Sequence, residues 1–297
     1  MNVMIIGSSG QLGRELQAIK KLHKKLNLFF YNRKDLDISL KSDVDLFLSS
    51  NQFDVIVNCA AYTNVEEAEN NFLIARSANA NSIDYLCKSL EKYNPKTVFI
   101  HISTDYIFDG NFSMPITENE EPNPICKYGE TKLMGEQFLQ SSNISSIIIR
   151  VSWLYSLFGK NFLNTMLELG RTKKTINVVN DQTGSPTSAH DLANLIIKMI
   201  NSDNFLYFAN KKEVFNFSNS GSCSWYEFSR EILRLSESKC LVVPVSSSEF
   251  PSLAKRPHYS VLDSSKLASS FDLDINSWQN ALANNIKRIA TVKHKKI

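Results

Sequence analysis

The fold of this chain is decided by the segment Val3-Met4-Ile5-Ile6-Gly7-Ser8-Ser9-Gly10-Gln11-Leu12-Gly13. Its first four residues are apolar and favour a buried strand, and the glycines after them favour a turn into a helix. Glycines at 7, 10 and 13 let the backbone pass close to a pyrophosphate held at a helix N-terminus. The spacing is G-x-x-G-x-x-G rather than G-x-G-x-x-G, so an ordinary glycine turn is the alternative. Its place at the chain start, before a second hydrophobic strand, favours a nucleotide site.

Short β-branched or aromatic runs alternate with helical patterns along the chain, which predicts βαβ units and a parallel sheet. The expected strands are residues 3–6, 28–31, 54–58, 97–102, 146–151, 176–179 and 214–217. The expected helices are residues 12–26, 74–93, 128–140 and 191–200. We therefore predict an α/β fold, a Rossmann-type doubly wound parallel sheet with helices on both faces.

The rhythm of the elements loosens after Trp153, where glycines and prolines break shorter elements. A second, smaller C-terminal lobe that binds the substrate is therefore expected. We assign residues 1–155 to a dinucleotide-binding Rossmann domain, with returning elements at about 174–202. The substrate-binding lobe would take residues of about 156–173 and 203–297.

Composition excludes several classes of protein. The 297 residues are 43% hydrophobic, which suits a globular chain with one large or two modest domains. The net charge of +3 is small and the basic residues are scattered, which argues against a nucleic-acid partner. No export or membrane segment is expected, because the apolar run at the start is far shorter than the ~18 residues of a span. The five cysteines form no C-x-x-C pair and indicate reduced thiols in the cytoplasm.

Tyr128 and Lys132 lie four residues apart on an expected helix, so both side chains share one face, about 5–6 Å apart at Cβ. A neighbouring lysine and an oxidised nicotinamide ring both favour the phenolate, so we expect the pKa of Tyr128 to move toward neutrality. Such a phenol can give a proton to a carbonyl oxygen while hydride reaches its carbon. Thr104, which follows an expected strand at the carboxyl edge of the sheet, is placed to hydrogen-bond the same oxygen. This pattern predicts nicotinamide-dependent carbonyl reduction.

The choice of cofactor depends on the end of the second expected strand, Tyr31-Asn32-Arg33, about 20 residues beyond the last glycine. A fold that prefers NAD usually presents an acid there. Arg33 is suited instead to the 2′-phosphate of NADPH, so with Asn32 we place it in the cofactor site. NADH stays open, because Asp35 or Asp37 is near enough to reach the ribose. A solvated loop arginine is the alternative interpretation of Arg33.

Seven sequence blocks carry a resemblance to known proteins, and they are distributed over nearly the whole chain. They are residues 7–13, 58–63, 101–110, 128–136, 150–155, 180–187 and 256–260. Together they resemble the extended short-chain dehydrogenase/reductases and, within them, the dTDP-4-dehydrorhamnose reductase family. Sugar-nucleotide dehydratases of the same superfamily have a glutamate after Thr-Asp, whereas Tyr106 stands there in this chain. Without that base, simple reduction is favoured over elimination.

The resemblance implies roles for individual residues. Thr104 would orient a sugar keto oxygen, Tyr128 would protonate it, and Lys132 would hold the ribose and tune the phenol. Asp105 and Trp153 would contact the sugar. The implied cofactor residues are Gly10, Gln11, Leu12, Asp37, Ile38, Ala61, Tyr62 and Thr63.

Arg256 is the candidate ligand for a substrate diphosphate, because a guanidinium matches phosphate geometry bidentately. A surface charge is the alternative interpretation. Some relatives hold magnesium between subunits through acidic side chains, and Glu15 matches one such position. His190 occupies another, so we predict no metal site.

The expected reaction is NAD(P)H-dependent reduction of the C4 keto group of dTDP-4-dehydro-L-rhamnose to dTDP-L-rhamnose, for surface polysaccharide. One alternative is a reductase of another nucleotide-linked 4-keto-deoxysugar, because fold and triad do not fix the sugar. Another is a regulatory subunit of methionine adenosyltransferase type, which the intact Thr104, Tyr128 and Lys132 argue against. The oligomeric state stays open, with a homodimer as one alternative.

Overall fold

The computed structural model describes residues 1–20, 25–208, 211–250 and 252–294. Its core is a six-stranded parallel sheet in the order β10-β5-β4-β3-β1-β2. The strands are β1 (Asn2–Ile6), β2 (Asn27–Tyr31), β3 (Val55–Asn58), β4 (Val98–Thr104), β5 (Ser146–Val151) and β10 (Lys212–Phe217). The predicted doubly wound α/β fold is confirmed.

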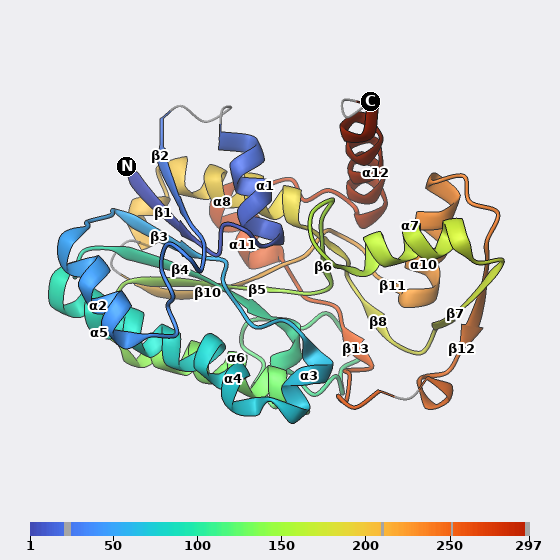
Figure 1. Cartoon of the computed structure of the whole chain (residues 1–297), viewed down its shortest axis with the longest axis horizontal. Helices are drawn as coiled ribbons and strands as arrows, with labels where there is room; N and C mark the ends of the chain where they lie inside the picture. The colour runs from blue at the N-terminus through green and yellow to red at the C-terminus, as the bar shows by residue number, and fades with distance from the viewer. Residues whose placement is uncertain (21–24, 209–210, 251, 295–297) are drawn as a thin grey trace.

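Helices cover both faces of this sheet (Figure 1). One face packs against α1 (Gln11–Ile19), α8 (Ala189–Asn201) and α11 (Ser265–Phe271). The other packs against α2 (Lys41–Ser50), α5 (Ser82–Tyr93) and α6 (Lys127–Ser141). Successive residues of β1 alternate between the two cores: Val3 and Ile5 face the first, and Met4 and Ile6 the second. This alternation follows from the two-residue period of a strand, and burial on both faces explains the continuous apolar run.

The ends of the central strands determine where ligands can bind. From β1 the chain passes to β2 on one side, and later returns to β3 on the other. Sheets with such a reversal usually bind their ligands beside it, at the carboxyl ends of the strands. The glycine turn after β1 and the segments after β3 and β4 all lie at this edge. Between β3 and α5 lie α3 (Val65–Asn70), α4 (Phe72–Arg76) and the π-helical segment Ser77–Asn81.

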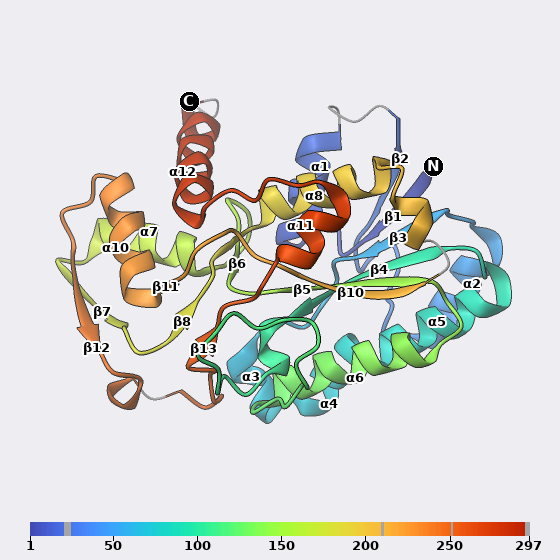
Figure 2. The ribbon, with the colours of Figure 1, turned by 180° about the vertical axis from the view of Figure 1, so that it is seen from behind.

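A smaller lobe lies beside the carboxyl edge of the sheet, and it is the part of Figure 1 that carries α7, α10, β7 and β12. Its helices are α7 (Phe162–Thr172), α10 (Trp225–Leu235) and α12 (Trp278–His294). Its strands form three small sheets from β6 (Leu154–Tyr155), β7 (Thr175–Val179), β8 (Thr183–Gly184), β9 (Thr187–Ser188), β11 (Cys223–Ser224), β12 (Leu241–Val245) and β13 (Tyr259–Ser260). The rear view shows the same separation of lobe and sheet (Figure 2). The helix α9 (Phe205–Phe208) and the 3-10 segments Asp105–Ile107 and Ser247–Glu249 complete the described elements.

Two strands belong to a different sheet from the one that the expected domain boundaries predict. β7, within the expected returning segment 174–202, pairs with β12 of the lobe and not with the central sheet. Only Val178 of this strand is buried, so it lacks the apolar surface that a central strand needs. β10, within the range 203–297 given to the lobe, is instead the edge strand beside β5, and its Phe215 and Phe217 are buried in the first core. A β-branched or aromatic run predicts a strand but not its partner.

The helices also differ from expectation in two places. The helix expected at 74–93 is three segments, with a π-helical turn at Ser77–Asn81 between α4 and α5. The helix expected at 12–26 ends at Ile19, and residues 21–24 lie outside the described part of the chain. Among the described helices, none is both long and apolar enough to cross a bilayer.

Candidate active site

The glycine turn brings three backbone segments together. Gly7 has φ +77°, and a Cβ there would lie 2.5 Å from the backbone nitrogen of Ala60. A Cβ at Gly13 would lie 2.5 Å from the carbonyl oxygen of Gly7. Only glycine fits either place, so the turn after β1, the segment after β3 and the start of α1 are in contact. No side chain caps α1 at Gly10, which leaves the backbone N–H groups around Gln11 and Leu12 for a ligand.

The segment after β2 holds the residues considered for cofactor choice. Arg33 has a side chain that is 79% exposed, and its Nε lies 2.9 Å from Oδ2 of Asp37. Burial opposes ionisation of Asp37, but hydrogen bonds from Ser39 and from Arg33 outweigh it and lower the pKa of this carboxyl. Asn32 begins the turn, and Ile38 is buried in the second core. Arg33 is therefore an exposed cation that follows β2, with a carboxylate as its present partner.

A buried asparagine, which sequence reasoning missed, connects the segment Ala61–Thr63 to α6. The Tyr62 amide donates to Oδ1 of Asn79 over 2.7 Å. The side-chain amide of Asn79 donates to the Tyr62 carbonyl and to Oγ1 of Thr131 on α6. Asn79 is 1% exposed and belongs to the π-helical segment, a feature that often occurs at functional sites. A polar residue on the apolar side of the helix pattern was the only sequence signal for it.

The predicted catalytic residues converge at the carboxyl end of β4. Thr104 is the last residue of that strand, and α6 places Tyr128 and Lys132 one turn apart beside it. Tyr128 is 8% exposed, and its ring meets Tyr106 edge-on at a centroid distance of 5.6 Å. Burial raises the pKa of Tyr128 above its usual value, and the nearby Thr104 hydroxyl acts in the opposite direction. The move toward neutrality was expected with an oxidised nicotinamide beside the phenol; in the chain by itself burial acts in the opposite direction.

Lys132 is 1% exposed and contacts groups of β4. Its Nζ donates to the Ile102 carbonyl over 2.7 Å and lies 3.3 Å from Nε2 of His101. Burial lowers the pKa of Lys132 to about 8, and the charge of Glu136 acts in the opposite direction. His101 is buried, and it contacts this predicted catalytic lysine.

The direction of the hydrogen bonds behind Lys132 follows from one backbone amide. The Ala60 N–H donates to Oδ1 of Asn58, so Nδ2 of that side chain faces Nδ1 of His101, at 3.2 Å. Nδ2 can only donate, so Nδ1 accepts, and neutral His101 carries its proton on Nε2. Burial lowers the pKa of His101, which keeps the ring neutral. Its Nε2–H thus points at Lys132, and this contact is a hydrogen bond only when the lysine is a neutral amine.

Asp105 follows Thr104 and is 2% exposed. Thr104 donates to its Oδ1 over 3.0 Å, whereas its Oδ2 has no partner among the described residues. Burial raises the pKa of Asp105 to about 7, and the nearby hydroxyls of Thr104 and of Ser260 in β13 act in the opposite direction. An orphaned, buried carboxyl oxygen beside Thr104 is suited to accept a hydrogen bond from a ligand.

Arg256 approaches the same place from the segment before β13. Its Nη2 lies 2.6 Å from Oε1 of Glu66 in α3, and the other oxygen of Glu66 accepts from the backbone amides of Leu253 and Ala254. Ala254 is buried in the same apolar cluster as Tyr128. The segment 252–256 is thus bound to α3 next to Tyr128, and Arg256 is an ion-paired residue rather than an isolated surface charge.

Trp153 stands where the chain leaves the central sheet for the lobe. Its backbone is left-handed, with φ 47°, which costs a bulky residue about 1–3 kcal/mol. Its ring stacks on Trp225 at a centroid distance of 3.5 Å and an interplanar angle of 8°. Sequence reasoning missed Trp225, because no pattern links a residue at the start of α10 to one that follows β5.

The remaining candidates belong to other environments. Glu15 is fully buried and bonded to Ser156 at 2.7 Å and to Arg288 at 2.6 Å, with His190 at 3.3 Å. Within the described part of the chain, no three His, Cys, Asp or Glu side chains are grouped as metal ligands would be. Cys126 caps α6, and burial raises its pKa to about 11, as suits an unreactive thiol.

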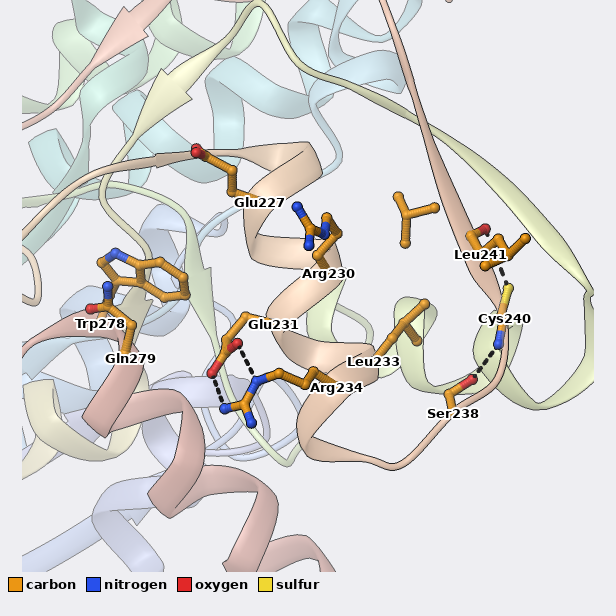
Figure 3. Close-up of a pocket in the computed structure, with 11 residues that line it drawn as sticks. Glu227, Arg230, Glu231, Leu233, Arg234, Ser238, Cys240, Leu241, Trp278 and Gln279 are labelled. Carbon is orange, nitrogen blue, oxygen red and sulfur yellow. Dashed lines mark hydrogen bonds and ion pairs between the residues drawn. The ribbon is translucent and has the colours of Figure 1, made fainter.

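A pocket of about 530 Å³ lies in the lobe between α10, β12 and the start of α12 (Figure 3). Its charged lining includes Glu231 and Arg234, which pair with each other at 2.6 Å. None of the residues that line it is a predicted site residue. The candidate site is therefore the set of residues at the strand ends and not this pocket.

Comparisons with known proteins agree along the whole chain. The family model of the RmlD substrate binding domain matches residues 1–291. A dTDP-4-dehydrorhamnose reductase of Aggregatibacter actinomycetemcomitans is 34% identical over 292 residues, which cover 95% of this chain and 97% of the relative. The crystal structure of a dTDP-4-dehydrorhamnose reductase from Clostridium acetobutylicum matches with a TM-score of 0.89 and 38% identity, over 98% of this chain and 100% of that one. The Bacillus anthracis dTDP-4-dehydrorhamnose reductase, solved in complex with NADP, matches with a TM-score of 0.89 and 35% identity, over 97% and 99% of the two chains.

Proposed function

The chain belongs to the RmlD substrate binding domain family, and from that premise we propose that it reduces dTDP-4-dehydro-L-rhamnose to dTDP-L-rhamnose with a reduced nicotinamide cofactor. The observation that carries the proposal is the convergence of Thr104, Asp105, Tyr128 and Lys132 at the carboxyl edge of the sheet, next to the glycine turn. The product would serve the synthesis of surface polysaccharide.

The cofactor fits the strand ends on the chain's own geometry. The glycines at 7 and 13 leave space that a Cβ would fill, and the uncapped start of α1 offers N–H groups to a pyrophosphate. The Bacillus anthracis relative is a complex with NADP, which supports NADPH as the cofactor here. Arg33 would pair with its 2′-phosphate, exchanging Asp37 for a dianion of matching geometry. NADPH supplies the hydride when bound.

Tyr128 would donate a proton to the keto oxygen. Because burial raises its pKa, the phenol keeps its proton at neutral pH, as an acid must before it reacts. Thr104 would hold the same oxygen through its hydroxyl, which at present donates to Asp105. Lys132, facing the ribose, would favour the phenolate that remains after transfer. Its pKa of about 8 leaves it mostly charged at neutral pH.

The substrate would lie between the residues Thr104, Tyr128 and Lys132 and the smaller lobe. Oδ2 of Asp105, which lacks a partner among the described residues, would accept from a sugar hydroxyl, and Trp153 would contact the ring. Arg256 would bind the diphosphate, as its place beside Tyr106 and Glu66 permits.

Tyr128→Phe tests the role of the phenol. The variant should bind NADPH normally and lose turnover by a factor of roughly 100 or more, which is the usual contribution of general acid catalysis. Turnover is measured as loss of nicotinamide absorbance with dTDP-4-dehydrorhamnose. Tyr155→Phe, which removes another buried hydroxyl, is the control and should retain activity. A fully active Tyr128→Phe enzyme would show that another group supplies the proton.

The identity of the sugar is tested on the product. NMR of the product from two or three nucleotide-linked keto-sugars gives both the preferred substrate and the epimer made. Reduction of a different keto-deoxysugar in preference to dTDP-4-dehydrorhamnose would keep the mechanism and change the substrate.

The location and assembly of the chain are also proposals. The five cysteines are all free thiols, which supports the reducing cytoplasm. A homodimer remains an alternative to the monomer, and sedimentation equilibrium distinguishes them.

A further inference from the structure

Hydrogen bonds on both sides of Trp153 fix its backbone. It follows Ser152, whose hydroxyl donates to the Ser185 carbonyl, and its own carbonyl accepts from the Thr187 amide. Both bonds join the end of β5 to the segment of β8 and β9. Between them the chain turns in the left-handed region, so the direction of the indole is set by a strained residue fixed at each side.

The indole is also confined by two residues of the lobe. A Cβ added at Gly184 would lie 2.5 Å from Cε2 of Trp153, so the ring lies directly on that glycine. Trp225 stacks on the ring at 3.5 Å and 8°. Gly184 pairs with Cys223 of β11, and Trp225 follows that strand, so the two contacts come from one small sheet.

Trp225 is itself rigidly placed. It is the first residue of α10, whose start is fixed by a capping box in which Ser224 and Glu227 exchange hydrogen bonds. Phe162 packs against the Trp225 ring at 4.4 Å. A ring so held can fix the angle of its neighbour, as a flexible side chain cannot.

Trp153 is half-buried, so part of its indole is open to a ligand or to solvent. The neighbouring β13 places Ser260 beside Asp105, and the same β13 pairs with β8 at Gly184. The indole of Trp153 thus lies on the same small sheet of the lobe that places Ser260 next to Asp105.

We infer that Trp225 and Gly184 form a clamp that positions Trp153 for the sugar, with Trp225 as a positioning residue for the reduction. The inference rests on the proposed function. Loss of the clamp should weaken binding of the nucleotide sugar and leave proton transfer at Tyr128 and cofactor binding intact.

The test compares Trp225→Ala, Trp225→Phe and Gly184→Ala with the wild-type chain. Trp225→Ala and Gly184→Ala should each raise KM for dTDP-4-dehydrorhamnose about fivefold or more, as expected for loss of an aromatic pair, with smaller changes in kcat and in NADPH affinity. Trp225→Phe retains a ring, so its KM should lie between the KM of these two variants and that of the wild type. The two substitutions change two different contacts of the indole, so agreement between them does not depend on one variant folding well.

A spectroscopic readout accompanies the kinetics. The chain has 3 tryptophans, so a nitrogen-labelled sample gives three indole N–H signals in its NMR spectrum. Trp225→Phe should remove one signal and shift that of Trp153, because the stacked ring displaces its resonance. Trp278→Phe is the matched control: it lies in the same lobe, packs edge-on against Phe228 and lines the pocket of Figure 3. It should leave both the Trp153 signal and KM unchanged.

The outcomes separate this inference from the function on which it rests. A wild-type chain that binds NADPH but reduces no keto-sugar refutes the proposed function, and this inference with it. An active wild type whose Trp225→Ala and Gly184→Ala variants keep its KM overturns the clamp alone. The same follows if Trp278→Phe raises KM as much as Trp225→Ala, because the effect would then be a general loosening of the lobe.

Discussion

Replacing Asp105 by asparagine tests the electrostatics of the buried carboxyl beside Thr104. In the folded chain burial raises the pKa of Asp105 from 3.8 to about 7, against the effect of the nearby Thr104 and Ser260 hydroxyls. One pH unit in a pKa corresponds to ~1.4 kcal/mol, so ionising this carboxyl costs roughly 4 kcal/mol more in the folded than in the unfolded chain.

The sign follows from proton binding. Between the two pKa values the folded chain holds a proton at Asp105 that the unfolded chain has released, so this group makes stability fall as pH rises. The contribution is fully favourable below the unfolded value and is lost as pH passes through the folded value. An asparagine side chain has no proton to lose at this position, so Asp105→Asn should become more stable relative to the wild type as pH rises, by about 2–3 kcal/mol between pH 5 and 8.

The assay is urea unfolding of the cofactor-free protein at both pH values, and the quantity of interest is the change in the difference between variant and wild type. Other groups titrate equally in both proteins and cancel. The control is Asp109→Asn on the same segment: hydrogen bonds of Asn111 lower the pKa of Asp109 below 3.8, so this carboxyl is ionised in both states at pH 5 and 8 and its variant should show no such change with pH. A difference between Asp105→Asn and wild type that does not change with pH would refute the reasoning, since Asp105 would then be solvated or already paired.

Two further changes test the cofactor site and the support of the catalytic helix. Arg33→Ala should weaken NADPH binding about tenfold or more and leave NADH binding unchanged, because a charged hydrogen bond to phosphate contributes ~1.5–3 kcal/mol. Titration of the variant with each cofactor measures both affinities, and the adjacent Lys34→Ala is the control. An equal loss of affinity for both cofactors would contradict the assignment. Glu136→Gln should destabilise the fold by about 3–5 kcal/mol, because it leaves the guanidinium of Arg150, 4% exposed and 2.8 Å away, buried without its charge partner. Urea unfolding measures this loss. The control is Glu231→Gln, which breaks the exposed pair of Glu231 and Arg234. Equal losses of stability in the two variants would show that burial does not set the cost.

The pKa of Tyr128 shows how a motif can predict a residue without predicting its state. The four-residue spacing predicted that Tyr128 and Lys132 share a face, and α6 places them so. It did not predict that the lysine would contact the carbonyl of Ile102 and the ring of His101, and not the phenol. Those partners lie on β4, about 30 residues earlier in the chain. Sharing a helix face therefore does not by itself bring the lysine ammonium into contact with the phenol.

The sequence alone was enough for the features that depend on local chemistry. Apolar runs and glycines between 3 and 13 specify a buried strand and a turn that only residues without Cβ can form, and helical periodicity puts Tyr128 and Lys132 on one face. The tertiary structure decided which segments meet. It placed β10 and not β7 beside β5, put Asn79 between the Tyr62 segment and α6, and stacked Trp225 on Trp153 across 72 residues of chain. Pairing and stacking over such distances depend on complementary surfaces that exist only after the chain has folded, so no spacing along the sequence contains them.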